Sequence, residues 1–110
     1  MRSVLLDAGW LRHELVLQSA ALLPDGLGGH AEGWSEVASL FGLIEPVAAN
    51  STVSADQTLE TVTHRITIRR RDGLRSGMRF VKGTRVFAIV TVHDPDETGR
   101  YLVCRAREEQ

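Results

Sequence analysis

The chain has 110 residues, which is enough for one small domain with a modest hydrophobic core. Hydrophobic residues make up 43% of it, charged residues 25%, and the net charge is −1. These values exclude a histone-like polycation and a disordered acidic chain. The single cysteine, Cys104, excludes an internal disulfide and a multi-cysteine zinc site. Residues 4–11 are too short and too interrupted for a membrane span or a secretory signal, so we expect a soluble protein with no membrane partner.

In chain order, the hydrophobic pattern predicts short strands separated by turns. We expect strands at residues 14–18, 34–47, 61–69, 78–81, 85–92 and 100–107. Uneven alternation in the second strand predicts a bulge or bend near Gly42. The clearest alternation puts four side chains of the third strand on one apolar face: Val62, His64, Ile66 and Ile68. Residues 85–92 are more uniformly apolar, which is typical of a central strand.

Two connections are longer than ordinary hairpin turns. Residues 23–30 are rich in glycine and predict a loop, and residues 48–57 are small and polar, typical of a functional loop or of one helical turn. The segment before residue 11 is compatible with a short helix or a docking arm. We therefore expect an N-terminal arm at residues 1–10 and a domain at residues 11–110. The domain is predicted to be all-β, a small antiparallel β-barrel of about six strands with long loops.

The residues that could carry catalysis lack suitable partners in sequence. His13, His30, His64 and His93 have no metal-ligand spacing, and Cys104 has no close histidine. We interpret His64 as a partly buried, hydrogen-bonded side chain and Cys104 as a small apolar residue of the core. No nucleophile or phosphate-loop motif is present. The sequence therefore predicts no enzyme, no catalytic or metal-binding residues and no cofactor.

Charge is strongly segregated along the chain. Residues 1–64 carry two basic and eight acidic side chains (net −6), whereas residues 65–85 carry eight basic and one acidic (net +7). Seven of these basic residues make up what we call the basic strip: Arg65, Arg69, Arg70, Arg71, Arg75, Arg79 and Lys82. Three interpretations remain open: a solvated strand end with a basic turn, a contact with the acidic face of the next subunit, or a DNA-facing surface.

Several short blocks occur in a recognisable order and spacing. They are residues 11–18 (LRHELVLQ), 24–34 (PDGLGGHAEGW), 44–46 (IEP), 63–69 (THRITIR), 77–80 (GMRF), 85–89 (RVFAI), 93–96 (HDPD) and 101–104 (YLVC). Together they resemble the head–tail joining proteins of long-tailed bacteriophages, also called head-closure or stopper proteins, a family that also occurs in gene transfer agents. The resemblance covers residues 11–108.

The resemblance implies a structural role in a virion or particle neck, with assembly in the bacterial cytoplasm. The expected partners are copies of the same chain in a ring (a hexamer), a portal–adaptor ring above, a tail terminator or tail tube below, and double-stranded DNA passing through the channel. Members of the family project a loop into this channel, and the candidate here is Asn50, Ser51, Thr52, Val53, Ser54, Ala55 and Asp56. Residues 23–31 would then face a neighbouring ring. The alternative function is a nucleic-acid-binding β-barrel that uses residues 65–85.

Overall fold

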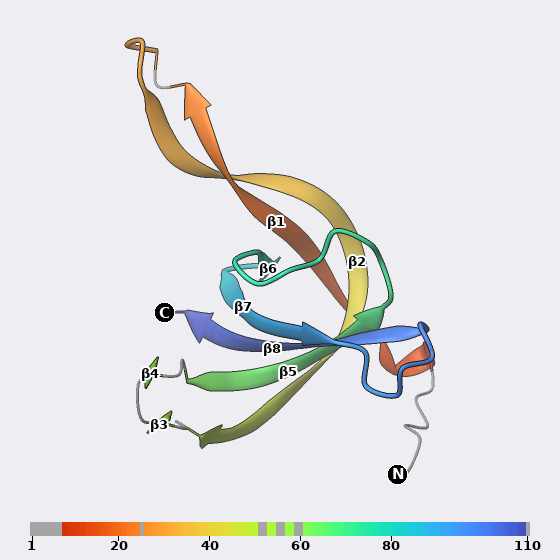
Figure 1. The fold of residues 1–110 in the computed structure, drawn as a ribbon. Coiled ribbons are helices and arrows are strands. Elements are labelled where there is room, and N and C mark those ends of the chain that lie inside the picture. Colours follow the sequence, from red (N-terminus) through yellow and green to blue (C-terminus); the bar gives the residue numbers. More distant parts are fainter. Residues whose placement is uncertain (1–7, 25, 51–52, 55–56, 59–60, 110) are drawn as a thin grey trace.

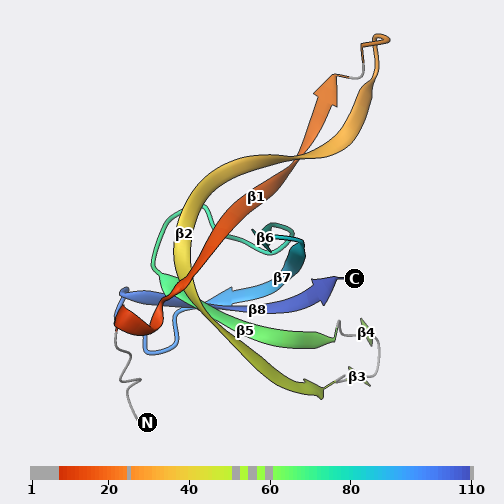
Figure 2. The ribbon, with the colours of Figure 1, turned by 180° about the vertical axis from the view of Figure 1, so that it is seen from behind.

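The computed structural model describes residues 8–24, 26–50, 53–54, 57–58 and 61–109. Within these ranges the chain is built of strands, preceded by one 3-10 turn, which confirms the predicted all-β class. The elements are η1 (Ala8–Trp10), β1 (His13–Pro24), β2 (His30–Asn50), β3 (Val53–Ser54), β4 (Gln57–Thr58), β5 (Val62–Arg69), β6 (Arg79–Lys82), β7 (Arg85–His93) and β8 (Tyr101–Glu109). Figure 1 and the reverse view in Figure 2 show their arrangement.

Six strands close into one antiparallel barrel in the order β1-β2-β5-β8-β7-β6. The barrel closes where β1 pairs with β6 over three residues, Val16 to Gln18. Where the ring of strands is closed, the paired residues lack the exposed edges that a small open sheet would present. In this circular order β5 and β6 lie on opposite sides of the barrel, a fact that matters for the basic residues described below.

The core fills the inside of this barrel. The largest fully buried side chains are Phe80, Phe87, Leu15, Leu17, Ile66, Ile68 and Cys104. They come from strands all around the barrel, because alternate residues of each strand point inward. The predicted apolar face of β5 is confirmed at Ile66 and Ile68. Thr67 between them is also buried, because the outer face of β5 is partly covered at this point.

Of the bulge or bend predicted near Gly42, the bulge lies five residues earlier in β2. The register between β1 and β2 shifts at Leu17 and Gln18, which leaves Val37 as the extra residue of β2. Gly42 is instead a site of close approach. A Cβ atom at Gly42 would lie 2.9 Å from Leu15 Cδ1 and 3.2 Å from the backbone oxygen of Thr67. The missing side chain therefore reflects tight packing between neighbouring strands rather than an irregular register.

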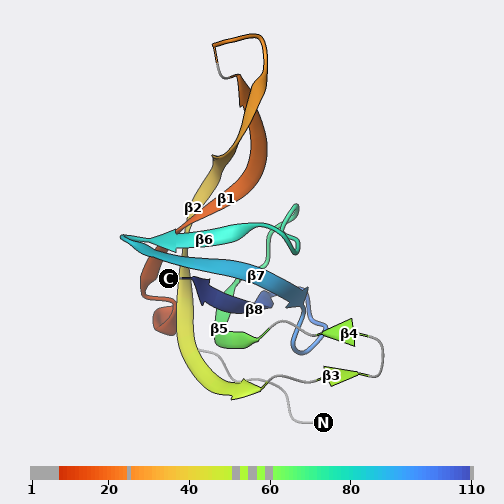
Figure 3. The ribbon, with the colours of Figure 1, turned by 90° about the vertical axis from the view of Figure 1, so that its left-hand side faces the viewer.

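The first two strands extend far beyond the barrel and form a hairpin arm. Past Gln18, β1 pairs only with β2, and the arm continues to the pair Pro24–His30. The arm stands alone above the other strands in Figure 3. It accounts for the elongated shape, 55 × 38 × 24 Å, and for a radius of gyration of 15.5 Å, against the ~13 Å expected of a compact chain of this length. Both strands are longer than predicted, and the loop expected at residues 23–30 narrows to a turn centred on Gly26–Gly29.

The connection between β2 and β5 also contains more regular structure than expected. β2 continues to Asn50, and Val53–Ser54 pairs with Gln57–Thr58 as a small two-stranded sheet. This corrects the expectation that residues 48–57 lack strands. The pair lies beyond the ends of β2 and β5, well away from the tip of the hairpin arm (Figures 1 and 3).

Candidate functional site

The structure divides the basic strip between opposite sides of the barrel. Arg65 and Arg69 share the outer face of β5, where alternate residues point the same way. Arg79 and Lys82 belong to β6, on the other side of the ring of strands. Arg75 is exposed in the connection between these strands. The seven residues therefore do not form one continuous basic surface.

Arg79 is engaged within its own chain. Its Nε donates a hydrogen bond of 2.7 Å to Oε1 of Gln18, and its guanidinium lies 3.9 Å from the centre of the Trp34 ring. The two partners belong to β1 and β2, so this contact ties the base of the hairpin arm to β6. Its geometry indicates a structural role for Arg79.

The arginines at the end of β5 are arranged differently. Arg69, Arg70 and Arg71 line a cavity of about 300 Å³ together with Leu40 and Phe41 of β2. We call these five residues the arginine cluster. Arg70 pairs with Asp72 at 3.1 Å, and both side chains are substantially exposed. The Nε atom of Arg71 is buried and has no hydrogen-bond partner within the described residues. A buried donor without an acceptor is costly, which marks this cluster as incomplete in the isolated chain.

The hairpin arm displays apolar side chains to solvent. Among the described residues, six large hydrophobic side chains are exposed. Leu22, Leu27 and Trp34 of these lie on the arm, and Val37 and Phe41 follow on the part of β2 that belongs to the barrel. The exposed fraction reaches 69% at Leu22 and 91% at Leu27. Residues 13–50 also contain five acidic residues and no lysine or arginine. An acidic, apolar arm of this kind is typical of a segment that is covered in an assembly.

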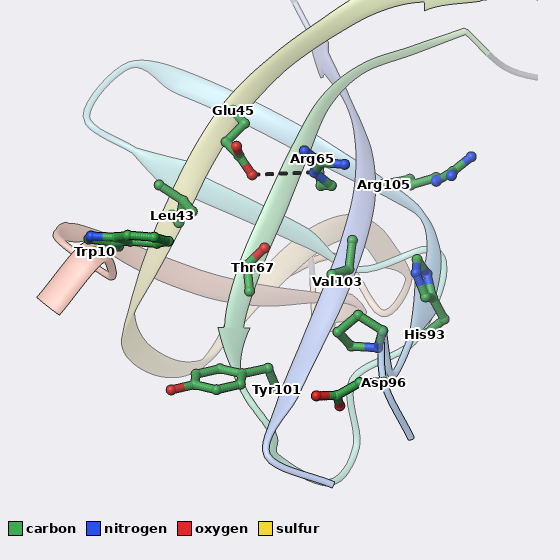
Figure 4. Close-up of a pocket in the computed structure, with 11 residues that line it drawn as sticks. Trp10, Leu43, Glu45, Arg65, Thr67, His93, Asp96, Tyr101, Val103 and Arg105 are labelled. Atoms are coloured by element: carbon green, nitrogen blue, oxygen red, sulfur yellow. Dashed lines mark hydrogen bonds and ion pairs between the residues drawn. The ribbon is translucent and has the colours of Figure 1, made fainter. Parts of the chain in front are cut away.

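A second cavity, of about 310 Å³, lies on the outer face of β2, β5 and β8 (Figure 4). Trp10 and Leu43 line one end of it, and Tyr101 lies at the lower margin in the view. Arg65 and Arg105 are direct partners across β5 and β8, an unfavourable pairing of like charges. Glu45 offsets it through an ion pair with Arg65 at 3.3 Å. The volume is at the lower limit for a small-molecule site.

The connection between β7 and β8 forms one margin of this cavity. The Asp94 carboxylate accepts hydrogen bonds from the backbone N–H groups of Asp96 and Gly99, and Asp96 accepts two from Thr98. These bonds from Thr98 lower the pKa of Asp96. Gly99 has a φ of 77°, as the predicted turn requires. The acidic side chains of this turn therefore bind their own backbone.

A polar cluster occupies one end of the barrel. Arg85 donates two hydrogen bonds to Glu108, of 2.8 and 3.1 Å, and these lower the pKa of Glu108 and raise that of Arg85. His64 lies 3.8 Å from the same carboxylate and packs edge-on against the ring of Phe87. Its Nδ1 is 2.9 Å from the hydroxyl of Thr63. His64 is thus partly buried and hydrogen-bonded, as interpreted from the sequence.

The other candidate chemical groups have ordinary structural positions. Cys104 is fully buried in the core, and this burial raises its pKa to about 12, so the thiol is unreactive at neutral pH. Within the described ranges, no group of three histidine, cysteine, aspartate or glutamate side chains is placed to hold a metal ion. In the same part of the chain, no helix is long and apolar enough to cross a membrane.

The candidate channel loop is described only in part. Asn50 ends β2, and Val53 and Ser54 form β3. Ser51, Thr52, Ala55 and Asp56 lie outside the described residues. The described pairs place this connection at the end of β2 that is remote from the hairpin arm (Figure 1).

Comparison with known proteins decides the family. The family model described as phage head completion protein matches residues 6–109. The chain belongs to this family. The match confirms the family resemblance found in the ordered sequence blocks. No curated protein matches the chain.

Two solved structures are similar to the chain in fold and sequence. A chain in the virion of a native gene transfer agent particle is 30% identical, with a TM-score of 0.67, and the match covers 91% of this chain and 96% of that one. A solution structure of a protein from Shigella flexneri 2a is 26% identical, with a TM-score of 0.66, and covers 96% of this chain and 100% of that one. Both matches span nearly the full barrel and arm.

Sequence reasoning found the basic residues but missed the arm. It identified Arg69, Arg70 and Arg71 as a charged group, and the structure brings these three together. It did not identify the exposed apolar side chains of the arm as a feature. Their signal was the lack of lysine and arginine from residue 13 to 50, combined with the apolar residues Leu22 and Leu27 beside a glycine-rich turn.

Proposed function

We propose that the protein is a non-catalytic head-closure component, which forms a ring in the particle neck between the portal–adaptor complex and the tail. In this position it retains the packaged double-stranded DNA and lets it pass during delivery. The observation that carries the proposal is the head completion family match over residues 6–109. The 30% identical chain in a gene transfer agent virion supports it.

The shape of the chain is suited to a ring. A head-to-tail ring needs two different, complementary surfaces on each subunit. The acidic, apolar hairpin arm and the basic outer face of β5 are two such surfaces. We propose a hexamer assembled in the bacterial cytoplasm, with an adaptor ring on one side and a tail terminator or tail tube on the other.

We further propose that residues 50–56 form the loop that faces the channel. The pairing of β3 with β4 gives this connection a hairpin form that extends past the barrel strands. Its sequence, NSTVSAD, has no basic residue, so it offers no strong phosphate contact to passing DNA. A loop of this composition can narrow the channel without binding the DNA tightly.

The distribution of charge favours assembly over nucleic-acid binding as the main role. A nucleic-acid-binding module concentrates its basic side chains on one surface. Here Arg79 and Lys82 are on the opposite side from Arg65, and Arg65 and Arg70 pair with acidic side chains. The alternative built on residues 65–85 therefore lacks a continuous basic surface.

Deletion of the gene from its phage or gene transfer element tests the proposed function. We expect DNA-filled heads without tails, or heads that lose their DNA, as seen by electron microscopy and by nuclease protection of packaged DNA. Supplying the intact gene in trans is the control and should restore tailed particles. Normal tailed particles in the deletion strain would contradict the head-closure role.

A further inference from the structure

We propose that the tip of the hairpin arm of one subunit docks on the arginine cluster of the next subunit. The tip is defined here as Leu22, Leu27 and Glu32, and the cluster as Leu40, Phe41, Arg69, Arg70 and Arg71. This inference rests on the ring proposed above and specifies which surfaces close it; it differs from the expectation that residues 23–31 face a neighbouring ring.

Charge complementarity is the first argument. From Gln18 to its partner Glu36, the arm has three acidic residues and no lysine or arginine, and Glu32 near its tip is exposed. The cluster has three adjacent arginines, of which Arg70 is paired with Asp72. Two surfaces of opposite sign on one chain attract when copies meet head to tail, and they discourage a symmetric face-to-face contact.

Apolar complementarity is the second argument. Leu22 and Leu27 are among the most exposed large side chains of the described residues. The cluster includes Phe41, which is 54% exposed, and Leu40 beside it. The cavity between them and the arginines, about 300 Å³, is large enough to receive a leucine side chain. Contact between the two would remove apolar surface from water on both subunits.

The third argument is the unsatisfied donor. Arg71 Nε is buried with no acceptor in the described part of the chain. A carboxylate docked on the cluster would draw in and reorient the guanidinium groups, giving them charged acceptors. In the isolated subunit, Arg71 Nε therefore lacks a hydrogen bond that an acidic partner can supply.

The reach of the arm agrees with the width of a subunit. From Phe41 back to the turn that precedes His30, β2 runs roughly 35 Å, at about 3.3 Å per residue. The subunit measures 38 and 24 Å across its shorter directions. An arm of this length can span from one subunit to the equivalent position on its neighbour. It is also too long for its tip to touch the cluster of its own chain.

Cysteine crosslinking in assembled particles tests the contact. Particles would carry the double variant Leu27→Cys/Phe41→Cys and be treated with a short bis-maleimide. We expect a ladder of crosslinked multimers of this chain in denaturing gels, because each subunit offers one cysteine to each neighbour. The natural Cys104 is buried and should not react. Each single-cysteine variant should give no ladder.

The matched control moves the second cysteine to the margin of the other cavity. The double variant Leu27→Cys/Thr98→Cys keeps the tip cysteine, and Thr98 is exposed in the β7–β8 connection. We expect no ladder from it. Three outcomes would each overturn the proposal. The first is a ladder from this control as strong as that from the Leu27→Cys/Phe41→Cys variant. The others are no multimers in particles that contain the normal amount of protein, and crosslinks only to another virion protein.

Charge reversal distinguishes a neighbouring subunit from DNA as the partner of the arginines. Glu32→Arg and Arg69→Glu should each lower the yield of tailed particles at least about tenfold, and the combined variant should recover most of the loss, since the pair is restored in reverse. A combined variant no better than Arg69→Glu alone would overturn the charge pairing. The gene deletion separates this contact from the head-closure role. If deletion gives tailless, DNA-filled heads but the combined variant shows no recovery, this contact is rejected and the head-closure role stands.

Discussion

At the scale of single residues, Gly42 is a position where the barrel leaves no room for a side chain. The nearest neighbours of an added Cβ would be Leu15 Cδ1 at 2.9 Å, Ile68 Cγ2 at 3.2 Å and the Thr67 backbone oxygen at 3.2 Å. A leucine methyl group can rotate away, but the backbone oxygen is held in the β2–β5 ladder. The crowding is therefore only partly relieved by side-chain movement.

We predict that Gly42→Ala destabilises the fold by about 1–3 kcal/mol, the usual cost of overpacking. This exceeds the gain of about 0.4–1 kcal/mol from restricting the unfolded chain. Urea unfolding of the isolated protein measures the difference. Ser39→Ala, at an exposed site of the same strand, should change stability by less than about 0.5 kcal/mol. A Gly42→Ala protein as stable as the natural one would show that the strands can separate without cost.

The Arg85–Glu108 pair predicts a pH dependence of stability. Because its folded-state pKa is lowered, Glu108 stabilises the fold above the ordinary pKa of a glutamate, and this contribution is lost as the pH falls through the lowered value. Glu108→Gln should therefore reduce the melting temperature at neutral pH, and the difference from the natural protein should vanish in acid. In an Arg85→Gln background the same substitution should have little effect, because the main partner is gone. An equal difference at all pH values would contradict the role of the carboxylate charge.

Patterns in the sequence predicted which side chains are buried better than they predicted how the strands pair and contact one another. Burial at Ile66 and Ile68 follows from alternation within one strand, so local sequence was enough. The bulge at Val37 depends on how β2 is matched to β1, which local sequence does not specify. Gly42 stood out in the sequence as a glycine in a strand, but its reason, contact with two neighbouring strands, required the closed barrel.

At the scale of elements, the hairpin arm depends on its attachment to β6. A two-stranded hairpin is marginally stable in water. The arm base is held by Arg79, which bonds Gln18 on β1 and stacks on Trp34 of β2. This contact sets the direction in which the arm leaves the barrel.

We predict that Arg79→Ala loosens the arm while leaving the barrel folded. The loss of the cation–π contact and one hydrogen bond should cost about 1–2 kcal/mol. Tryptophan fluorescence in a Trp10→Phe background reports on Trp34 alone and should shift to longer wavelength as the ring becomes wetter. Lys82→Ala on the same strand is the control and should leave the emission unchanged. An unshifted spectrum in Arg79→Ala would contradict the anchoring role.

Element boundaries were predictable where alternation or turn residues mark the ends of a strand. β5 agrees closely with its expected range because its alternation persists to its end, and β7 and β8 agree because a turn lies between them. The outer parts of β1 and β2 lack this alternation, since both faces of the arm are exposed and carry small or apolar residues. Their strand structure comes from pairing with each other, so the predicted β1 ended too early and the predicted β2 began too late.

At the scale of the whole molecule, closure of the barrel is the feature that local patterns cannot specify. Val16 and Val81 are partners although they are far apart in sequence. The several short strands correctly predicted a barrel. They did not predict that β1 would close it by pairing with β6. The same closure separates Arg65 from Arg79, which are near in sequence and on opposite sides of the barrel. A basic segment was therefore visible in the sequence, whereas its division between two sides was not.

The division into barrel and arm predicts that the two can be separated by truncation. The distal arm has no sheet partner outside itself beyond Gln18, and the closed barrel contains all of the largest fully buried side chains. Replacing residues 21–33 by Asn-Gly would join Ala20 to Trp34, which already face each other across β1 and β2, through a two-residue turn. The contact between Trp34 and Arg79 is kept in this variant.

We expect the truncated protein to unfold cooperatively, with a melting temperature close to that of the natural protein, because the replaced segment contributes none of the buried core side chains of the described residues. In particles, however, it should fail to replace the natural gene, since Leu22, Leu27 and Glu32 are absent and the ring contact cannot form. Circular dichroism of the purified chain and counts of tailed particles measure the two effects. A control that replaces only Leu27 by serine keeps the length of the arm and the turn glycines Gly26 and Gly28, whose φ angles are positive, and it should reduce the number of tailed particles less. A truncated protein that does not fold would show that the arm stabilises the barrel, and one that folds and supports normal particles would show that assembly does not use the arm.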